Sequence, residues 1–324
     1  MKAIHITAIG GPEVLKPVDV PEPDVGPGMV RVRNRVIAIN FHDIGARRHG
    51  EPGQTPPFIP GTDFAGEVDA IGDGVEGIAI GDRILGIAMV GAYAEKTVTP
   101  AFMTVPIPDD ISFEQAASCP VAGLTAHFLL EDNYVGPGTT VLAYAAAGSN
   151  GCYLGGLIKQ RGARGIGLVS TEEKAEIARK AGWDDVIIYT QEDMVTGVAK
   201  RTEDNGADLV LDSVAGPDFK RSFDMTKAGG MVVLYGRAAG EFPMTSVEEG
   251  LLMAGRNLGL RTYFLGTTLM SQPEQLRPAF EKLFEAWRSD VLHIPFESLP
   301  LAEAADAHER IEGQKTYGKV LLVP

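Results

Sequence analysis

The chain has 324 residues, of which 44% are hydrophobic and 22% charged; these proportions are ordinary for a globular protein and argue against disorder. A chain of this length exceeds the usual size of one hydrophobic core, so we expect two domains. The 43 acidic and 29 basic side chains give a formal net charge of -14, which disfavours nucleic acid as the main partner because its phosphates would be repelled.

The sequence also disfavours membrane insertion and disulfide bonding. No stretch approaches roughly 18 uninterrupted apolar residues, the length that a helix needs to cross a bilayer. Met1 to Ile4 do not begin a long apolar segment of the secretory type, and the two cysteines are Cys119 and Cys152. We therefore expect a cytoplasmic protein with reduced thiols and no membrane partner.

Residues 1 to about 120 predict a mostly β, barrel-like domain. They are rich in Gly and Pro and contain several short apolar runs between tight turns. Examples of these runs are 30–33, 66–68 and 83–86.

A change of pattern at Ser112 predicts the first helix of a second domain. Ser112 is a suitable N-cap for a helical stretch over 113–117, and Glu114 and Gln115 lie near the position that completes a capping box. Further on, short apolar segments alternate with helical ones, which is the βαβ pattern of a parallel sheet. The expected strands are 139–144, 164–169, 185–189, 207–212, 230–235 and 257–262, and the expected helices are 151–161, 171–181 and 217–227.

The carboxyl-terminal part of the chain predicts a helix near 273–290 and a final strand within 318–323. That last segment is short and strongly apolar. We therefore expect it to pair with the sheet of the first domain.

The segment 141–151 is the most informative in the chain. An apolar run ends in small residues and then in Gly148 and Gly151, while Ala146 stands where the G-x-G-x-x-G fingerprint has its first glycine. A strand that turns into a helix in this way exposes backbone N–H groups at the positive helix end and lets a diphosphate approach closely. A nucleotide is therefore the first ligand to consider, with an ordinary tight turn as the alternative for an isolated match.

Short motifs follow one another along nearly the whole chain in a specific order and spacing. They are Gly10-Gly11-Pro12-Glu13-Val14-Leu15, Ile39-Asn40-Phe41-His42-Asp43, Gly61-Thr62-Asp63-Phe64-Ala65-Gly66, Gly81-Asp82-Arg83, Gly91-Ala92-Tyr93-Ala94-Glu95, Gly123-Leu124-Thr125-Ala126, Asp212-Ser213-Val214-Ala215-Gly216, Ala304-Ala305-Asp306-Ala307-His308 and Gly318-Lys319. Together with the glycine turn, they resemble the zinc-free quinone oxidoreductase branch of the medium-chain dehydrogenase/reductase superfamily, the group that includes zeta-crystallin.

The resemblance implies an α/β fold with two domains. A GroES-like, β-rich catalytic domain would comprise residues 1–122 and 265–324, and a Rossmann domain with a doubly wound parallel sheet would comprise residues 123–264. It further implies a cofactor in the cleft between them. A homodimer is also implied, often made by joining the two Rossmann sheets edge to edge.

The resemblance also bears on metal binding. The positions of the catalytic zinc ligands in alcohol dehydrogenases correspond here to Asn40, Thr62 and about Val121, none of which supplies a thiolate or an imidazole. His42 and His49 lie close by, but with no cysteine near them we expect surface or hydrogen-bonding roles. We predict no metal, and without a Lewis acid simple alcohol oxidation is disfavoured.

NADPH is the expected cofactor. A preference for NAD usually shows as Asp or Glu at the end of the second Rossmann strand, and that acid is missing here. The resemblance places Ser170, Lys174 and Tyr189 around the adenosine 2′-phosphate. The alternative is that Lys174 is a solvated helix lysine, and Glu172 and Glu173 beside it weaken the positive field.

Other cofactor contacts follow from the resemblance by position. Asn40 and Thr125 match residues that approach the nicotinamide, where an amide and a hydroxyl can bind its carboxamide or ribose. For the aromatic residues, core packing is the alternative, and Tyr144 is interpreted as structural. The predicted cofactor-binding residues are Asn40, Thr125, Ala147, Gly148, Ser149, Asn150, Gly151, Ser170, Lys174, Tyr189, Tyr235, Gly236, Arg237, Phe264, Leu265 and Lys319.

The implied reaction is hydride transfer from NADPH to a quinone or to the β-carbon of an enone, with proximity and orientation as the main contribution of the protein. No side chain is clearly an essential acid. Enoyl thioester reductases of the superfamily place a Tyr in the loop after the Asn40 segment, and the loop here, 47–54, has none. His49 or Glu51 could replace it, although we expect both at the surface.

Two alternatives to the quinone or enone reductase stay open. A 2-enoyl thioester reductase is the enzymatic alternative. An NADPH-binding structural or RNA-binding protein with little catalysis is the alternative of another class, and the acidic charge balance argues against RNA.

Overall fold

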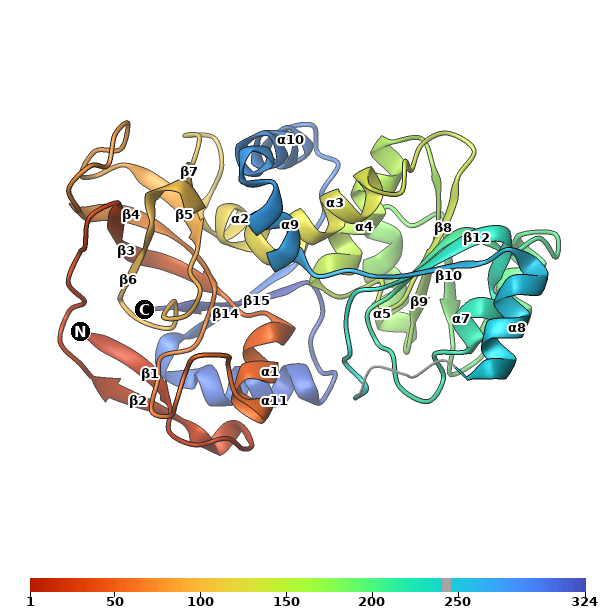
Figure 1. Cartoon of the computed structure of the whole chain (residues 1–324), viewed down its shortest axis with the longest axis horizontal. Helices are drawn as coiled ribbons and strands as arrows, with labels where there is room; N and C mark the ends of the chain where they lie inside the picture. Colours follow the sequence, from red (N-terminus) through yellow and green to blue (C-terminus); the bar gives the residue numbers. More distant parts are fainter. Residues whose placement is uncertain (241–245) are drawn as a thin grey trace. The chain divides into compact units, whose positions relative to one another are not determined.

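The computed structural model describes residues 1–240 and 246–324. The chain forms two compact units (Figure 1). Unit 1 comprises Met1–Leu124, Glu274–Phe284 and Pro295–Pro324, and unit 2 comprises Thr125–Pro273 and Glu285–Ile294. The chain therefore begins and ends in the same unit. The predicted domain boundaries at 122/123 and 264/265 stay a prediction.

Unit 1 is built around a sheet with the strand order β14-β15-β3-β4-β5-β7, in which β6 also pairs with β3. The carboxyl-terminal strand pairs antiparallel with β3, with Leu321 opposite Ala38, which confirms the prediction for the end of the chain. The strands are β3 (Met29–Ala38), β4 (Asp63–Ile71), β5 (Arg83–Ile87), β6 (Lys96–Pro100), β7 (Thr104–Pro106), β14 (Phe296–Pro300) and β15 (Lys319–Val323), and a separate hairpin pairs β1 (Lys2–Ile6) with β2 (Leu15–Asp19).

The core of unit 1 follows from the alternation of its strands. In β3, Val30 and Val32 are fully buried, whereas Arg33 and Arg35 point to solvent, because successive side chains of a strand face opposite sides. Ile37, which follows a shift in the register of β3 between Asn34 and Val36, and Leu322 of β15 join the same buried cluster. The buried face of the sheet therefore fixes the register of the terminal strand.

The helices of unit 1 are short, and one was predicted with its cap. The Ser112 hydroxyl accepts from the Gln115 N–H at 3.2 Å, and the Gln115 side chain accepts from the Ser112 N–H at 2.9 Å, so the capping box is confirmed. Helices lying in this unit are α1 (Phe41–His49), α2 (Phe113–Ser118) and α11 (Ala304–Glu312); α2 continues through a π turn at Cys119–Gly123 into α3 (Leu124–Glu131). Short 3-10 turns lie at Pro12–Val14, Ala101–Met103, Pro273–Gln275 and Leu301–Glu303.

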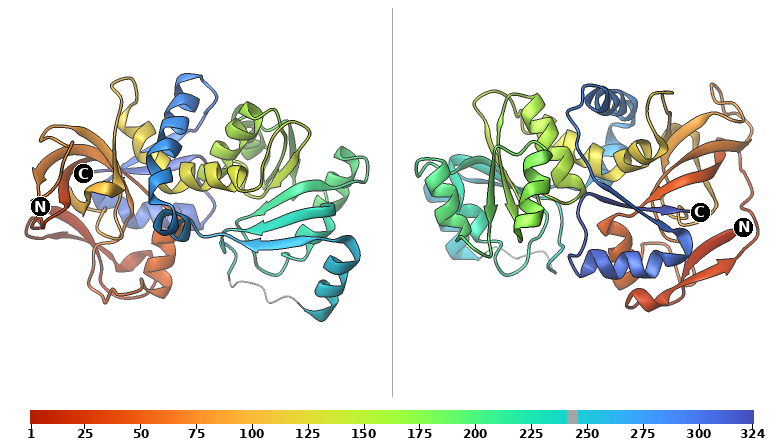
Figure 2. Two further views of the ribbon diagram at one scale, coloured as in Figure 1. Left: turned by 45° about the horizontal axis from the view of Figure 1, so that its top comes forward. Right: turned by 180° about the vertical axis from the view of Figure 1, so that it is seen from behind.

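Unit 2 contains a parallel sheet with the order β10-β9-β8-β11-β12-β13. The order runs outward in both directions from β8 and β11, so the connecting helices cover both faces of the sheet (Figure 2), as in a doubly wound fold. The strands are β8 (Thr140–Ala143), β9 (Arg164–Val169), β10 (Asp185–Ile188), β11 (Ala207–Asp212), β12 (Thr226–Leu234) and β13 (Gly259–Thr262). The parallel sheet predicted from the βαβ pattern is confirmed.

The helices of unit 2 agree only partly with the prediction. Two of the three predicted helices, 151–161 and 171–181, correspond to α4 and α5. The chain also contains α6 and α8, which lie between predicted strands as the alternation implies but whose ranges were not predicted; Asp193 and Ser246 are their N-caps. The helices are α4 (Ser149–Gln160), α5 (Glu172–Lys180), α6 (Met194–Arg201), α7 (Arg221–Asp224), α8 (Val247–Arg256), α9 (Leu265–Ser271) and α10 (Leu276–Arg288), the last of which contributes to both units.

The predicted helix at 217–227 is wrong. Only the single turn α7 forms there, and β12 begins at Thr226, which pairs with Ala207 of β11. A shift in register follows Ala207, and Gly229 adopts a φ of 77° in the irregular part of β12. Pairing with the neighbouring strand therefore overrides the local helical pattern.

No helix in the described ranges is both long and apolar enough to cross a membrane.

Candidate functional site

The glycine turn joins β8 to α4 at the carboxyl edge of the unit 2 sheet. Gly148 is the N-cap of α4, which begins at Ser149. Ala145 has a φ of 53°, in the left-handed region, and its carbonyl oxygen accepts from the Gly148 N–H at 2.9 Å. The backbone therefore turns tightly and leads directly into a helix amino terminus, as the sequence motif predicts.

Gly151 lies where a side chain would not fit. A Cβ on this residue would lie 2.4 Å from the carbonyl oxygen of Ala145 and 2.6 Å from the carbonyl carbon of Ala146. Both neighbours are backbone atoms, which cannot move aside as a flexible side chain can. The last glycine of the motif thus allows the helix to pack against the turn.

The amino end of α4 has the chemistry that a diphosphate requires. The first N–H groups of a helix lack intrahelical acceptors and carry a partial positive charge. Ser149, the first helical residue, has a buried hydroxyl oxygen with no hydrogen-bond partner among the described residues. A phosphate oxygen would satisfy both the amides and this hydroxyl, so the residues present fit the diphosphate of a dinucleotide.

The residues predicted for the 2′-phosphate follow the next two strands. Ser170 comes directly after β9, and Tyr189 comes directly after β10 with its side chain exposed. Lys174 lies in the first turn of α5, and its N–H donates to the N-cap hydroxyl of Thr171 at 3.3 Å. Burial lowers the pKa of the Lys174 ammonium, so an anion beside it would stabilise the charged form.

A buried polar chain that the sequence did not indicate lies behind the turn. The Ser222 hydroxyl donates to Asp212 Oδ2 at 2.9 Å, so the Tyr144 hydroxyl, 3.0 Å from Ser222 Oγ, is the donor in that pair. Asp212 Oδ1 accepts from the N–H groups of Val214 and Ala215 at 2.8 and 2.9 Å. Burial raises the pKa of the Asp212 carboxyl, and these hydrogen bonds oppose the rise. The interpretation of Tyr144 as structural agrees with these contacts.

The other predicted contacts of unit 2 follow β12 and β13 or lie in α3. A Cβ on Gly236 would lie 2.5 Å from the Ser213 carbonyl oxygen, so this glycine allows the ends of β11 and β12 to approach. Burial raises the pKa of the neighbouring Tyr235. Arg237 and Phe264 are exposed, Leu265 is buried and Thr125 is partly buried.

Unit 1 contains a cluster of buried polar side chains made of Asn40, Thr62, Asp63 and Lys319, which we call the Asn40 cluster. The Lys319 ammonium donates to Asn40 Oδ1 at 2.5 Å, and Asn40 Nδ2 donates to Thr62 Oγ1 at 3.1 Å. The Thr62 hydroxyl in turn donates to Asp63 Oδ1 at 2.9 Å. The direction of each bond fixes the orientation of the Asn40 amide.

The Val121 N–H completes the surroundings of Asp63. It donates to Asp63 Oδ2 at 2.9 Å, and the Lys319 ammonium lies 3.8 Å from the same oxygen. Asn40, Thr62 and Val121, the positions that the resemblance matches to zinc ligands, thus lie around the Asp63 carboxylate, beside which the Lys319 ammonium provides positive charge. Across residues 1–240 and 246–324, no three His, Cys, Asp or Glu side chains form a group that could hold a metal ion.

Lys319 and Asp63 are almost completely buried, with exposures of 1% and 0%. Burial lowers the pKa of the Lys319 ammonium, while Asp63 and Asp43 oppose that shift. Burial likewise raises the pKa of Asp63, while Lys319 opposes it. Both groups depend on each other and on the surrounding hydrogen bonds for their charged forms.

A second buried network holds the backbone of Asn40. Asp43 Oδ2 accepts from the Asn40 N–H at 2.8 Å and from the Tyr93 hydroxyl at 3.1 Å. Because Tyr93 uses its only proton in that bond, His308 Nε2, 3.0 Å away, is assigned as a donor to the Tyr93 oxygen. Burial lowers the pKa of His308 to about 4, so its ring is neutral at pH 7.

The segment predicted as a loop at 47–54 is partly helical, which corrects the sequence interpretation. Arg47, Arg48 and His49 form the last turn of α1. Arg47 is fully buried and its guanidinium pairs with Glu312 Oε2 at 2.6 Å. A carboxylate 265 residues away in the sequence therefore keeps this arginine inside the protein, which no local pattern indicates.

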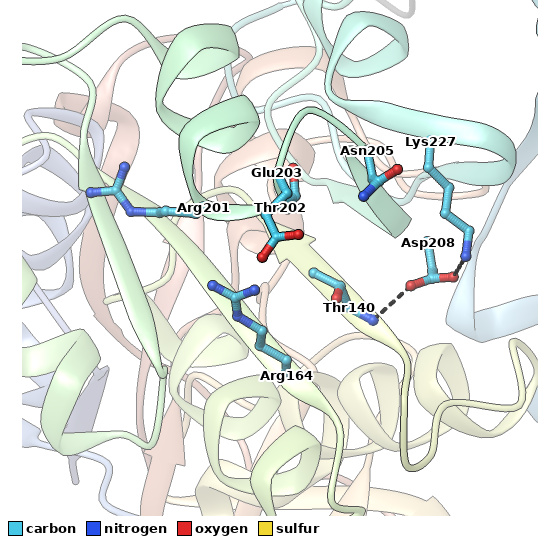
Figure 3. Close-up of a pocket in the computed structure, with 8 residues that line it drawn as sticks. All are labelled: Thr140, Arg164, Arg201, Thr202, Glu203, Asn205, Asp208 and Lys227. Atoms are coloured by element: carbon cyan, nitrogen blue, oxygen red, sulfur yellow. Dashed lines mark hydrogen bonds and ion pairs between the residues drawn. The ribbon is translucent and has the colours of Figure 1, made fainter.

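A cavity of about 300 Å³ lies at the opposite, amino edge of the unit 2 sheet (Figure 3). Its basic side chains are engaged with carboxylates: Lys227 pairs with Asp208, and Arg164 pairs with Asp185 at 2.7 Å. The glycine turn is at the carboxyl edge, so this cavity is separate from it. The lining residues are Thr140, Arg164, Arg201, Thr202, Glu203, Asn205, Asp208 and Lys227.

Comparison with known proteins identifies the family. Residues 26–109 match the alcohol dehydrogenase GroES-like domain, and residues 181–322 match the family described as zinc-binding dehydrogenase. The chain is 36% identical over 326 aligned residues to the quinone oxidoreductase of Pseudomonas aeruginosa, covering 100% of this chain and 99% of the relative. The chain belongs to the quinone oxidoreductase branch of the medium-chain dehydrogenase/reductase superfamily.

Other members of the family also align with all or nearly all of this chain. The chain is 35% identical to a 2-haloacrylate reductase of Burkholderia, with 97% of this chain and 96% of the relative aligned. The crystal structure of Escherichia coli quinone oxidoreductase complexed with NADPH superimposes with a TM-score of 0.95 at 33% identity, covering 100% of both chains. The predicted fold class, a GroES-like part combined with a Rossmann part, is confirmed.

Proposed function

We propose that this protein is an NADPH-dependent oxidoreductase that transfers a hydride to a quinone or to an α,β-unsaturated carbonyl compound, without zinc. The observation that carries the proposal is the full-length likeness to a quinone oxidoreductase whose structure contains NADPH. The 2-haloacrylate reductase among the relatives is named for an acid with an activated double bond, which favours testing such acceptors beside quinones. The glycine turn supports a dinucleotide cofactor independently.

The cofactor contacts predicted from the sequence are part of this proposal. The amino end of α4, from Ala147 to Gly151, would bind the diphosphate, and Ser170, Lys174 and Tyr189 would bind the 2′-phosphate. When bound, NADPH supplies the hydride. We assign Tyr235, Gly236 and Arg237 to the adenosine side, and Asn40, Thr125, Phe264 and Leu265 to the nicotinamide side, where Lys319 would contribute through Asn40.

Asn40 is the residue of unit 1 that is best prepared for a nicotinamide. Its carbonyl oxygen accepts from Lys319 and one of its N–H groups donates to Thr62, so the amide plane is held in one orientation. The amide has a second N–H, which we assign to the nicotinamide carboxamide or ribose. Lys319 would then act on the cofactor through Asn40, because its ammonium is buried.

The test is NADPH oxidation by the purified protein with a panel of quinones, enones, 2-haloacrylates and enoyl thioesters, with NADH as comparator. We expect turnover with quinones or unsaturated carbonyl compounds and a preference for NADPH. Turnover of thioesters alone would favour the thioester reductase alternative. Absence of turnover combined with tight, salt-dependent RNA binding in a gel-shift assay would favour the non-enzymatic alternative.

We also propose that the protein is a homodimer in the cytoplasm. Strand β13 lies at the edge of the unit 2 sheet and pairs with β12, so its other side offers backbone N–H and C=O groups that a second copy could bind. Cys119 and Cys152 are buried and form no disulfide bond, which suits a reducing compartment. Light scattering after gel filtration tests the dimer, and a mass of about 34.5 kDa, that of one chain, would contradict it.

A further inference from the structure

His42 is a titratable side chain of α1 that the cofactor assignments leave without a role. It follows Asn40 by two residues, and 39% of its side chain is exposed. Its Nδ1 lies 3.9 Å from Asp43 Oδ1, and its Nε2 lies 3.6 Å from Glu51 Oε2. The ring is therefore held between two carboxylates while part of it reaches solvent.

Asp43 lies within ion-pair distance of this imidazole. Its Oδ2 accepts from the Asn40 N–H and the Tyr93 hydroxyl, whereas its Oδ1 is buried and has no hydrogen-bond partner within the described residues. A buried carboxylate oxygen without a partner is costly, so a positive charge on the nearby His42 ring is favoured. The same carboxylate thus orients Asn40 and the imidazole.

The charges that face His42 are predominantly negative. Asp43 lies on α1, Glu51 on the segment after it and Asp63 on β4, while the Lys319 ammonium of β15 is paired with Asp63. The interaction with Asp43 raises the pKa of His42, Glu51 and Asp63 raise it further, and burial opposes them. His42 therefore keeps its proton to a higher pH than a free histidine does.

The surface of α1 beside His42 is open at Gly45. Phe41 is 43% exposed, and a Cβ on Gly45 would meet no atom within 4 Å. Residues three and four positions apart share one face of a helix, so Gly45 leaves open space beside both Phe41 and His42. An aromatic ring and an imidazole thus border a part of the helix that carries no side chain.

The other acids and bases in the two buried networks are not accessible in this way. Tyr93, His308 and Lys319 are each at most 1% exposed, and His308 is neutral. His49, which the sequence offered as an alternative acid, lies at the exposed far end of α1. His42 alone, of the histidines on this helix, is both held by carboxylates and close in sequence to Asn40.

We propose that His42 is the catalytic proton donor, an inference that rests on the proposed function. The acceptor gains two electrons and one hydrogen nucleus as the hydride, which leaves an enolate or a hydroquinone anion. A ring N–H bond of the imidazolium then breaks, and its proton forms a C–H bond at the α-carbon of the enolate or an O–H bond on the hydroquinone anion. The neutral imidazole regains a proton from solvent, to which it is exposed.

The first experiment compares His42→Gln with His49→Gln, the same substitution on the same helix. With the best acceptor, we expect kcat of His42→Gln to fall about 100-fold at pH 6.5, and kcat of His49→Gln to change less than about twofold. As pH rises, kcat of the wild type should fall when His42 loses its proton, with an apparent pKa above 6.5. The pH profile of His42→Gln should lack this fall. NADPH affinity, measured by fluorescence, should change less than about threefold in both variants.

Added imidazole provides a test that a structural role would not pass. The small side chain in His42→Ala leaves space for a free imidazole next to Asp43. We expect imidazole in the buffer to raise kcat of this variant at least about tenfold. An unchanged kcat and pH profile in His42→Gln, or no rescue of His42→Ala, overturns the proposal while NADPH-dependent turnover of the wild type upholds the proposed function. Absence of turnover in the wild type overturns both.

A spectroscopic measurement tests the state of His42 without turnover. NMR titration of protein with labelled histidine rings, with His42 assigned from the signal missing in His42→Gln, should give a pKa above 6.5. A value of 6.5 or below would mean that the neighbouring carboxylates do not favour the protonated ring, and the proposal would be wrong even if the enzyme reduces quinones.

Discussion

The glycine turn of unit 2 and the Asn40 cluster of unit 1 are built in opposite ways. The turn comprises residues that follow one another directly, and its contribution comes from backbone N–H groups and from the space that Gly151 leaves. The Asn40 cluster joins side chains from residues 40, 62, 63 and 319, and its contribution comes from charge and hydrogen bonds. One is a local backbone conformation, and the other exists only when distant strands pair.

The difference predicts how each site fails. A backbone site is damaged by an added atom, because the surrounding main chain cannot move. A side-chain cluster is damaged by a removed atom, because the remaining buried charges lose their partners. Substitutions in the two sites should therefore differ in size, in pH dependence and in rescue by a second substitution.

The largest effect is expected for Lys319→Met. This change leaves Asp63 buried without its cation and should lower the free energy of unfolding by roughly 3–5 kcal/mol, measured by urea denaturation. The double variant Lys319→Met with Asp63→Asn should recover part of the loss. Lys2→Met, which removes an exposed ion pair with Asp19, is the control and should leave the free energy of unfolding almost unchanged. Equal stability of Lys319→Met and wild type would show that the cluster is not a charged unit.

Acid should weaken unit 1 through His308. Its folded-state pKa of about 4 lies below the unfolded value of about 6.5, so the stability from the neutral ring is present above pH 6.5 and is lost as pH falls toward 4. The loss should reach about 3 kcal/mol, because one pKa unit corresponds to about 1.4 kcal/mol. Urea unfolding at pH 7 and pH 4.5 should show a smaller loss in His308→Gln than in wild type. Equal losses in the two proteins would contradict a neutral His308.

A single added carbon should damage the glycine turn. Gly151→Ala places a Cβ against the backbone of Ala145 and Ala146, and should cost roughly 1–3 kcal/mol of stability and weaken NADPH binding by about tenfold or more. Calorimetric titration with NADPH measures the affinity. Gly250→Ala in α8 is the matched control, since its added Cβ meets no atom within 4 Å. Similar NADPH affinity in both variants would refute the role of Gly151.

The smallest effect is expected at the surface of unit 2. Lys174→Gln removes one cation from the proposed 2′-phosphate contacts, and kcat/KM for NADPH should fall about tenfold, since a charged hydrogen bond contributes roughly 1.5–3 kcal/mol. The value for NADH should remain almost unchanged. Lys180→Gln, at the exposed end of the same helix, should alter neither value. An equal loss with both cofactors would remove Lys174 from the 2′-phosphate site.

The success of sequence reasoning varied with the range of the interactions involved. The capping box of Ser112 and Gln115, the strands of the parallel sheet and the turn before α4 depend on neighbours within a few residues, and all were predictable. The helix expected at 217–227 failed because pairing of Thr226 with Ala207 prevailed over the local pattern. Arg47 was expected in a loop from its position after the Asn40 segment, and nothing in the sequence indicates its partner, Glu312.

The candidate sites divide in the same way. Nucleotide binding could be inferred from consecutive residues, because the strand, the glycine turn and the helix amino terminus follow one another directly in the chain. The geometry around Asn40 depended on tertiary structure, because β15 must pair with β3 before Lys319 can reach Asn40. His42 was likewise expected to have a surface or hydrogen-bonding role, and only the fold adds Glu51 and Asp63 to its neighbour Asp43 as charges that act on it. Backbone conformation is a local property of the chain, whereas buried charge acquires its partners and its pKa only from the folded whole.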